Sequence, residues 1–278
     1  MINILAAVTL IWLLAATITD IKKREVADWL SFSLIAIAIF TALFTSIIEK
    51  DFSIIILSLI SFAAFMLIAN LFYYLRLFGG GDAKLLMALG PVIPQIAVKS
   101  VFNLPYLTSS AAFLLNICLL GAIYGLIYSL VLAIRNKKQF SEEIAKSKFP
   151  LIPFMIVAVI FAAISALVYP FLIFISILIV ILPPVFIFVK AVESACLIKT
   201  KETKELTEGD WLAYPARIKG KGKDILITAK FGLTKKEIEI LKRYKEKVVI
   251  KEGIPFVPVF LIALILTLLI GNLFELLI

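Results

Sequence analysis

Runs of apolar residues long enough to cross a lipid bilayer follow one another along most of this chain. Of its 278 residues, 62% are hydrophobic, whereas soluble domains contain about 45–50%. A membrane-spanning helix needs about 17–25 apolar residues. We therefore expect a polytopic all-α membrane protein with about eight transmembrane or re-entrant helices. These lie near residues 2–19, 30–48, 53–75, 83–98, 109–134, 150–168, 171–189 and 254–277.

The fourth apolar run is short and contains Pro91 and Pro94, so we expect it to be tilted, broken or re-entrant. The distribution of positive charge gives the helices an orientation. If the N-terminus lies outside, all of the 28 Lys and Arg residues except Lys50 and Lys99 fall on the cytoplasmic side. Cytoplasmic loops are enriched in these residues. This topology, with both termini outside, explains the net charge of +9 without nucleic acid as a partner.

A polar segment rich in Lys and Glu separates the last two apolar runs. It divides the chain into a membrane domain (1–189), a small cytoplasmic α/β domain (190–253) and a final transmembrane helix (254–278). The polar domain either guides a substrate or merely joins two helices. The first apolar run has no basic segment before it, so we expect a retained helix in the cell (cytoplasmic) membrane and no cleaved signal peptide.

Within the polar domain, strands are predicted over 211–218, 224–229 and 248–250. Thr234 and Glu237 have the spacing of a capping box and predict the start of a helix. Three residues then form a predicted apolar stripe, namely Ile238, Leu241 and Tyr244. The basic segment 135–149 is predicted to be a loop that helps to set the topology.

The chain has no histidine, and its two cysteines, Cys118 and Cys196, stand alone. Ser-His and Cys-His catalytic triads, histidine zinc motifs and a disulfide framework are therefore excluded. Carboxylates remain as the side chains that can carry acid–base chemistry.

Two aspartates are expected at the same face of the membrane. Asp20 follows the first apolar run, and Asp82 follows the third, directly after Gly79, Gly80 and Gly81. A charged group at the bilayer centre costs about 2.5–3.5 kcal/mol and usually has a function. Two adjacent carboxylates share a proton, so one can act as a base on water while the other acts as an acid.

The glycines before Asp82 are expected to form a flexible hinge that places this carboxylate and lets a substrate backbone approach. Each aspartate also has a simpler interpretation. Asp82 can cap the N-terminus of a helix, and Asp20 can be an ordinary interfacial carboxylate beside Lys22, Lys23 and Arg24.

The segment Gly79–Leu86, with sequence GGGDAKLL, is similar to the G-x-G-D-x-K-L segment of the type IV prepilin peptidases. This family includes the archaeal preflagellin (prearchaellin) peptidases and consists of GxGD membrane aspartyl proteases. The segment Asp20–Asp28 resembles the family's aspartate, basic cluster, aliphatic residue and closing Asp or Asn. The resemblance covers about the first 90 residues and returns at Lys251–Phe256.

This resemblance implies an aspartic-type endopeptidase in which Asp20 and Asp82 form the catalytic dyad and Gly79 and Gly81 belong to the motif. It implies archaellin or type IV pilin precursors as partners, cut after a short basic leader at the cytoplasmic face, beside membrane lipid. No cofactor and no metal are expected. Ala27 departs from the family pattern, because many relatives have proline there. The four-cysteine zinc site of many bacterial members is also missing.

Glu25 and Asp28 are candidates for binding a basic leader, since charge complementarity guides encounter and register. The alternative is that they only offset the adjacent lysines. Three other functions stay open. One is a proton- or ion-coupled transporter that uses the same aspartates, another is a presenilin-like GxGD intramembrane protease, and the last is a non-catalytic scaffold.

Overall fold

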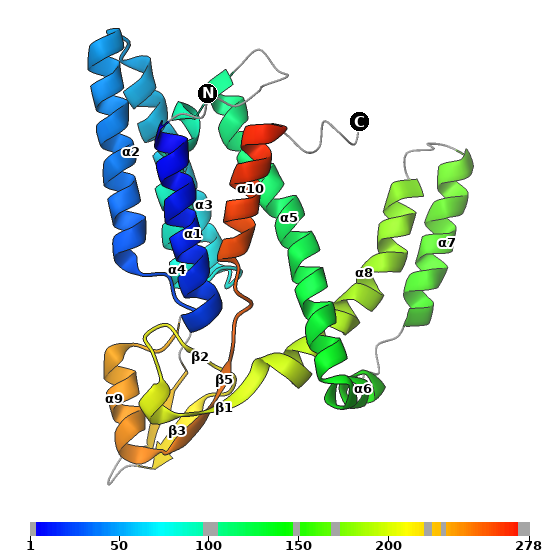
Figure 1. Cartoon of the computed structure of the whole chain (residues 1–278). Coiled ribbons are helices and arrows are strands. Elements are labelled where there is room, and N and C mark those ends of the chain that lie inside the picture. Colours follow the sequence, from blue (N-terminus) through cyan, green and yellow to red (C-terminus); the bar gives the residue numbers. More distant parts are fainter. Residues whose placement is uncertain are drawn as a thin grey trace. The chain divides into compact units, whose positions relative to one another are not determined.

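The computed structural model of the chain describes residues 4–96, 105–146, 151–167, 173–219, 224–228 and 232–271 (Figure 1). The chain divides into two compact units. The first comprises Met1–Gly125 together with Gly253–Ile278, and the second comprises Leu126–Glu252. The second unit is thus an insertion in the sequence of the first.

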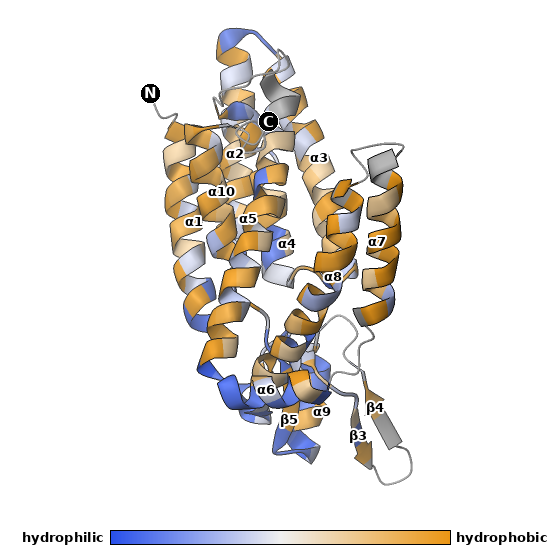
Figure 2. Ribbon diagram, turned by 90° about the vertical axis from the view of Figure 1, so that its right-hand side faces the viewer, coloured by the Kyte–Doolittle hydropathy of each residue, from blue (hydrophilic) through white to orange (hydrophobic). Residues whose placement is uncertain are grey.

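The first unit is a bundle of helices. Helix α10 packs against α1, and the two lie side by side in both views (Figures 1 and 2). The short helix α4 packs against both α2 and α3. The elements of this unit are α1 (Ile4–Lys23), α2 (Asp28–Glu49), α3 (Ser53–Tyr74), α4 (Gly80–Leu89), the 3₁₀ helix η1 (Ile93–Gln95), the first part of α5 (Pro105–Arg135) and α10 (Val257–Leu269).

Five helical segments of the described residues are long and apolar enough to cross a membrane. They are α1, α2, α3, Ser109–Arg135 within α5, and Ile175–Leu197. Two shorter apolar helices cover Ile152–Ile164 and Val257–Leu269. Figure 2 shows the hydrophobic colour along most of these helices. A mostly helical, multi-pass membrane protein is therefore confirmed, while the number of eight spans stays a prediction.

The fourth apolar run is broken, as its prolines predicted. Helix α4 has only ten residues, which gives it a length of about 15 Å, half of the hydrocarbon core of about 30 Å. A Cβ at Gly90 would lie 2.9 Å from the Cβ of Phe65 in α3, so the chain turns in close contact with that helix. The side chain of Gln95 in η1 then donates to the carbonyl of Ala38 in α2 at 2.8 Å. The last two residues of the predicted run, 97 and 98, lie outside the described residues.

Buried hydrogen bonds join the helices of the first unit across its apolar core. Asn116 in α5 is fully buried, and its Nδ2 donates to Thr267 Oγ1 of α10 at 2.9 Å and to the Gly271 carbonyl at 2.8 Å. Such bonds hold helices together where apolar side chains gain nothing by leaving lipid. The largest core side chains are Leu13, Leu30, Leu34, Phe65, Leu85, Leu86, Leu89, Ile93, Phe113 and Phe260.

The second unit contains helices and a small antiparallel sheet. Helices α7 and α8 pack together, and the strands pair in the order β1-β5-β2, with β3 and β4 forming a separate hairpin. Its elements are the rest of α5, α6 (Lys137–Lys146), α7 (Leu151–Leu167), α8 (Ile173–Val192), the π-helical turn η3 (Glu193–Leu197), β1 (Ile198–Glu202), η4 (Thr203–Glu205), β2 (Trp211–Leu212), β3 (Ala216–Lys219), β4 (Asp224–Ile227), α9 (Lys235–Tyr244) and β5 (Lys247–Lys251).

The helix predicted after Thr234 is confirmed. Thr234 Oγ1 accepts from the Glu237 amide at 3.4 Å, and the Glu237 carboxylate accepts from the Thr234 amide at 2.9 Å. Ile238 and Leu241 are buried, whereas Tyr244 is 57% exposed and does not belong to the apolar stripe. Strand β5 confirms the third predicted strand.

Two predictions for this unit are wrong. The single strand predicted over 211–218 is divided, because Pro215 lacks the N–H that a continuing ladder requires. Its first part, β2, pairs with β5, and its second part, β3, pairs with β4. The basic segment predicted as a loop contains the helix α6, whose Phe140 contacts Phe188 of α8 with ring centroids 5.6 Å apart.

Candidate active site

Asp20 lies in the last turn of α1, and only 6% of its surface is exposed. Its Oδ2 accepts a hydrogen bond of 3.1 Å from the peptide N–H of Val257, the first residue of α10. The C-terminal end of a helix repels a negative charge, whereas an N-terminal end attracts one and has free N–H donors. The carboxylate of Asp20 is therefore stabilised by α10 and opposed by its own helix.

Asp82 is the third residue of α4 and is half-buried. Its Oδ2 accepts a hydrogen bond of 3.2 Å from the peptide N–H of Gly79, so it does cap its own helix. Helix α4 is not one of the five helical segments that are long and apolar enough to cross a membrane. Burial and then the nearby charge of Asp20 raise the pKa of Asp82 to about 7, against the lowering effect of the Gly79 N–H. The two aspartates, 62 positions apart in sequence, thus lie within electrostatic reach of one another.

Two of the glycines before Asp82 allow a close approach. A Cβ at Gly81 would lie 3.2 Å from the Cβ and 3.3 Å from the backbone nitrogen of Val26, in the connection between α1 and α2. A Cβ at Gly79 would lie 3.3 Å from Asp82 Oδ2. Gly80 has more room, since its nearest neighbour, in Tyr73, would be 3.9 Å away. None of the three has a positive φ, so space explains the glycines at 79 and 81.

The connection between α1 and α2 turns sharply at Arg24. This residue has a φ of 59°, a left-handed conformation that costs a non-glycine residue about 1–2 kcal/mol. Its peptide N–H donates to the Asp20 carbonyl at 2.8 Å, and its Nη1 donates to the carbonyl of Gly253 at 3.1 Å. The turn that follows Asp20 is therefore fixed to the segment that leads into α10.

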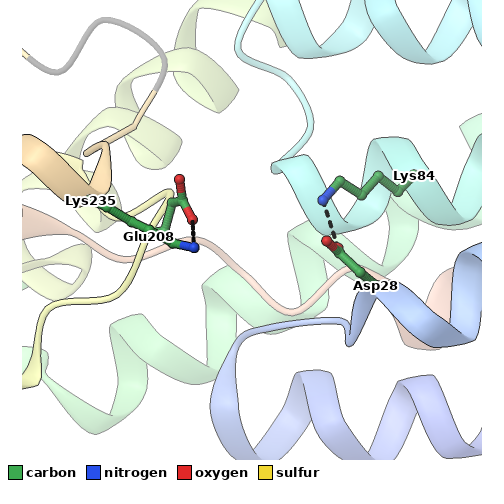
Figure 3. A network of polar contacts seen from close by, with 4 residues as sticks. All are labelled: Asp28, Lys84, Glu208 and Lys235. Carbon is green, nitrogen blue, oxygen red and sulfur yellow. Dashed lines mark hydrogen bonds and ion pairs between the residues drawn. The ribbon is translucent and has the colours of Figure 1, made fainter.

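The closing part of the first motif contacts α4. Lys84 Nζ lies 2.6 Å from Asp28 Oδ1 (Figure 3), and both side chains are well exposed. Glu25 is exposed as well. Ala27, where many members of the family resembled have proline, has a φ of −64°, which is the angle that a proline ring imposes. The turn keeps the shape that proline would give it.

Aromatic side chains surround the start of Gly79–Gly81, which we call the glycine segment. The sequence did not predict this feature. Phe78 lies 5.0 Å from Phe72, 5.0 Å from Phe256 and 5.9 Å from Phe260 between ring centroids. We call these four residues the aromatic cluster. Phe256 belongs to the second stretch of family resemblance, and that was the one available signal for it. The donor at Val257 is a backbone group, so no residue type could have indicated it.

Fold and site together define a class: a multi-pass helical membrane protein in which two carboxylates within electrostatic reach each accept a hydrogen bond from a peptide N–H at the start of a helix. Residues 7–126 match the model of the type IV leader peptidase family. The matched segment contains Asp20, Asp82 and the three glycines before Asp82. This part of the chain is similar to the type IV leader peptidase family.

Three curated relatives are preflagellin peptidases of methanogenic archaea. The protein from Methanocaldococcus jannaschii is 34% identical over 104 residues, which are 37% of this chain and 42% of that protein. The one from Methanococcus maripaludis is 30% identical over 102 residues, or 37% of this chain and 41% of that protein. The protein from Methanococcus voltae is 34% identical over 91 residues, which are 33% of this chain and 39% of that protein. The chain thus matches about two fifths of the length of these relatives.

Proposed function

We propose that this protein is a membrane aspartic-type endopeptidase that removes the short basic leader from archaellin or type IV pilin precursors. The observation that carries the proposal is the pair of Asp20 and Asp82: Asp20 accepts the first N–H of α10, Asp82 caps α4, and the charge of Asp20 helps to raise the pKa of Asp82. The family match over residues 7–126 and the three preflagellin peptidases support the substrate class.

The chemistry requires one ionised and one protonated carboxyl group. Asp82, whose pKa is raised to about 7, is the group that holds the proton. Asp20, which receives the Val257 N–H, is the ionised base. Asp20 removes a proton from water as the oxygen attacks the scissile carbonyl, and Asp82 donates its proton to the carbonyl oxygen. Collapse of the tetrahedral intermediate transfers a proton to the leaving amine and restores the pair.

The surroundings of the dyad give roles to the other motif residues. Gly81 lets α4 approach the connection between α1 and α2, and Gly79 leaves room for the Asp82 carboxylate, so that Asp82 reaches Asp20. Glu25 and Asp28 are exposed at the same connection and attract the basic leader. Asp28 already has an internal partner in Lys84, so a cation of the leader has to compete with that lysine.

The proposed arrangement in the membrane follows the charge pattern. About eight transmembrane or re-entrant helices have both termini outside, and the active site opens near the cytoplasmic face of the cell membrane. Residues 1–189 form the catalytic membrane domain, 190–253 a cytoplasmic α/β domain, and 254–278 the final helix. Labelling single cysteines at positions 22 and 50 from either side of sealed vesicles tests this orientation.

The decisive experiment is mass spectrometry of archaellin and pilin precursors after incubation with the purified protein in lipid. We expect a single cut after the basic leader by the wild type and none by Asp20→Asn or Asp82→Asn. Asp51→Asn, which changes an exposed carboxylate between α2 and α3, is the matched control and should cleave normally. Full activity of both dyad variants would refute the proposal. Ion flux in proteoliposomes that requires Asp82, without proteolysis, would establish the transporter instead.

A further inference from the structure

The segment Gly253–Phe256, directly before α10, contacts the turn that follows Asp20 and also Phe78, which precedes Gly79–Asp82. We propose that this pre-α10 segment positions the site. In this proposal, the packing of the Phe256 side chain determines the positions of Asp20 and of the glycine segment. The inference rests on the proposed function and extends it to residues outside the matched segment 7–126. Phe256 and its neighbours are positioning residues, since they act through the two aspartates.

Two hydrogen bonds connect the pre-α10 segment and its helix to the turn that contains Asp20. The Val257 N–H donates to Asp20 Oδ2 at 3.1 Å in a buried position. The Arg24 guanidinium donates to the Gly253 carbonyl at 3.1 Å. Because these contacts hold the segment at both its ends, a shift of α10 along or across α1 moves the Asp20 carboxylate.

Aromatic contacts connect the same segment to Phe78, which lies four positions before Asp82. Phe78 precedes the glycine segment and is 7% exposed. Its ring lies against Phe256 and Phe260 of the aromatic cluster, with centroids 5.0 and 5.9 Å apart. Phe256 and Phe260 also contact each other, at 5.5 Å. The start of α10 therefore supports Phe78 on one side and receives Asp20 on the other.

The position of Phe256 is set from its far side by α5. A Cβ at Gly121 would lie 2.7 Å from Phe256 Cζ and 3.0 Å from its Cε2, closer than real Cβ atoms come. Gly121 therefore makes the space for the ring. Gly125 lies one turn further along the same helix, and a Cβ there would have nothing within 4 Å. The two glycines therefore form a matched pair, of which only Gly121 lies against the Phe256 ring.

Gly121→Ala and Gly125→Ala test the inference on catalysis. We expect Gly121→Ala to lower kcat by about 10-fold or more, because a misplacement of about 1 Å in a catalytic geometry costs up to about 100-fold. KM should change less than about twofold, since only the transition-state contacts are lost. Gly125→Ala should keep the kcat of the wild type. Rates are taken well below the melting temperature of each variant, which separates positioning from loss of folded enzyme.

A second-site variant tests whether the displaced ring is the cause. Leu at position 256 lacks the ring atoms that a Cβ at 121 would meet, so Gly121→Ala combined with Phe256→Leu should recover the kcat of Phe256→Leu alone. Equal kcat values for Gly121→Ala and Gly125→Ala would overturn the inference. A double variant slower than Phe256→Leu alone would overturn it as well.

Hydrogen exchange tests the contact without any turnover. In Asp20→Ala, the Val257 amide loses its acceptor and should exchange about 10-fold faster or more, as expected for loss of one buried hydrogen bond. Asp28→Ala, on the other side of the turn, should leave that amide unchanged. An unchanged exchange rate in Asp20→Ala would overturn the inference. If the wild type cleaves no precursor, the proposed function fails, and the exchange experiment still decides whether α10 holds Asp20.

Discussion

The ammonium group of Lys84 lies 2.6 Å from the carboxylate of Asp28 and joins the two sequence motifs of this protein. Lys84 follows Asp82 by two positions in α4, and Asp28 begins α2. With side-chain exposures of 43% and 59%, the pair is worth about 0–1 kcal/mol in stability. An ion pair this weak can exchange partners, so the proposed function predicts that a basic leader competes with Lys84 for Asp28.

Neutralising Asp28 should weaken recognition of the leader and spare catalysis. For Asp28→Asn we expect KM for a precursor with a basic leader to rise by about 3- to 10-fold, since about 1.4 kcal/mol corresponds to a factor of ten. A precursor whose leader lysines are changed to glutamine should show a smaller effect. Initial rates over a range of precursor concentrations measure this, with Asp51→Asn as the control. An equal effect on both precursors would show that Asp28 does not contact the leader.

Gly80→Ala and Gly81→Ala should differ sharply although the residues are adjacent. At Gly81, a methyl group meets Val26 at 3.2 Å and its backbone nitrogen at 3.3 Å, so α4 must move away from Asp20. We expect kcat to fall by about 10- to 100-fold. At Gly80 the nearest atom is 3.9 Å away, and alanine should add about 0.5–1 kcal/mol of stability. Cleavage rates and thermal unfolding in detergent measure both effects, and equal rates would contradict the close approach.

The rate of cleavage should fall as the pH rises through about 7. Asp82 must hold a proton to act as the acid, and its pKa is raised to about 7 by burial and by Asp20. Below that pH the proton is present, and above it the acid is lost. A profile of kcat from pH 5 to 9 should therefore show an alkaline limb with one ionisation near neutrality. A rate that increases with pH across this range would mean that Asp82 acts as the base.

The same shift predicts how stability depends on pH. A carboxyl group whose pKa is raised from 3.8 to about 7 on folding favours the folded state fully below its unfolded pKa, and this contribution is lost as the pH rises through the folded one. Asp82→Asn keeps a neutral side chain at every pH. Relative to this variant, the wild type should lose stability between about pH 4 and pH 8, as thermal unfolding would show. A constant difference would mean that Asp82 is ionised in the folded protein.

Asn116 should matter for stability and not for catalysis. Its amide joins α5 to α10 through Thr267 and Gly271, in a buried position. We expect Asn116→Ala to cost about 1–2 kcal/mol, the range for polar contacts between membrane helices, and to leave kcat unchanged at low temperature. Asn70→Ala is the control, since that amide donates to Met66 in its own helix. Thermal unfolding and rates on the same preparations separate the two effects.

The apolar helices could be predicted from sequence because length and hydrophobicity are local properties. The two aspartates could be paired because successive membrane helices cross in opposite directions, which predicts that Asp20 and Asp82 lie on one side. Helix α6 was missed because its charged residues outnumber the few apolar ones, among them Phe140, that face a neighbour. Strand β1, with sequence IKTKE, has too little hydrophobic character to be recognised without its partner β5.

The positioning contacts could not be predicted, for a different reason. The donor to Asp20 is a peptide N–H 237 positions away, and every residue except proline has one. The space for Phe256 depends on a glycine within an apolar helix, where glycine is common. These features arise from the packing of helices that are distant in sequence.

Because α10 returns to the first unit after the second unit has been completed, the first 125 residues alone do not make up the whole of the first unit. A protein shortened to the family-matching segment would lack the N–H that reaches Asp20 and two of the four rings of the aromatic cluster, Phe256 and Phe260. Supplying residues 253–278 as a separate chain, expressed together with residues 1–125, should rebuild the dyad from two pieces. The inserted unit can then be replaced by a flexible linker, and the change in cleavage rate measures its contribution to the proposed activity.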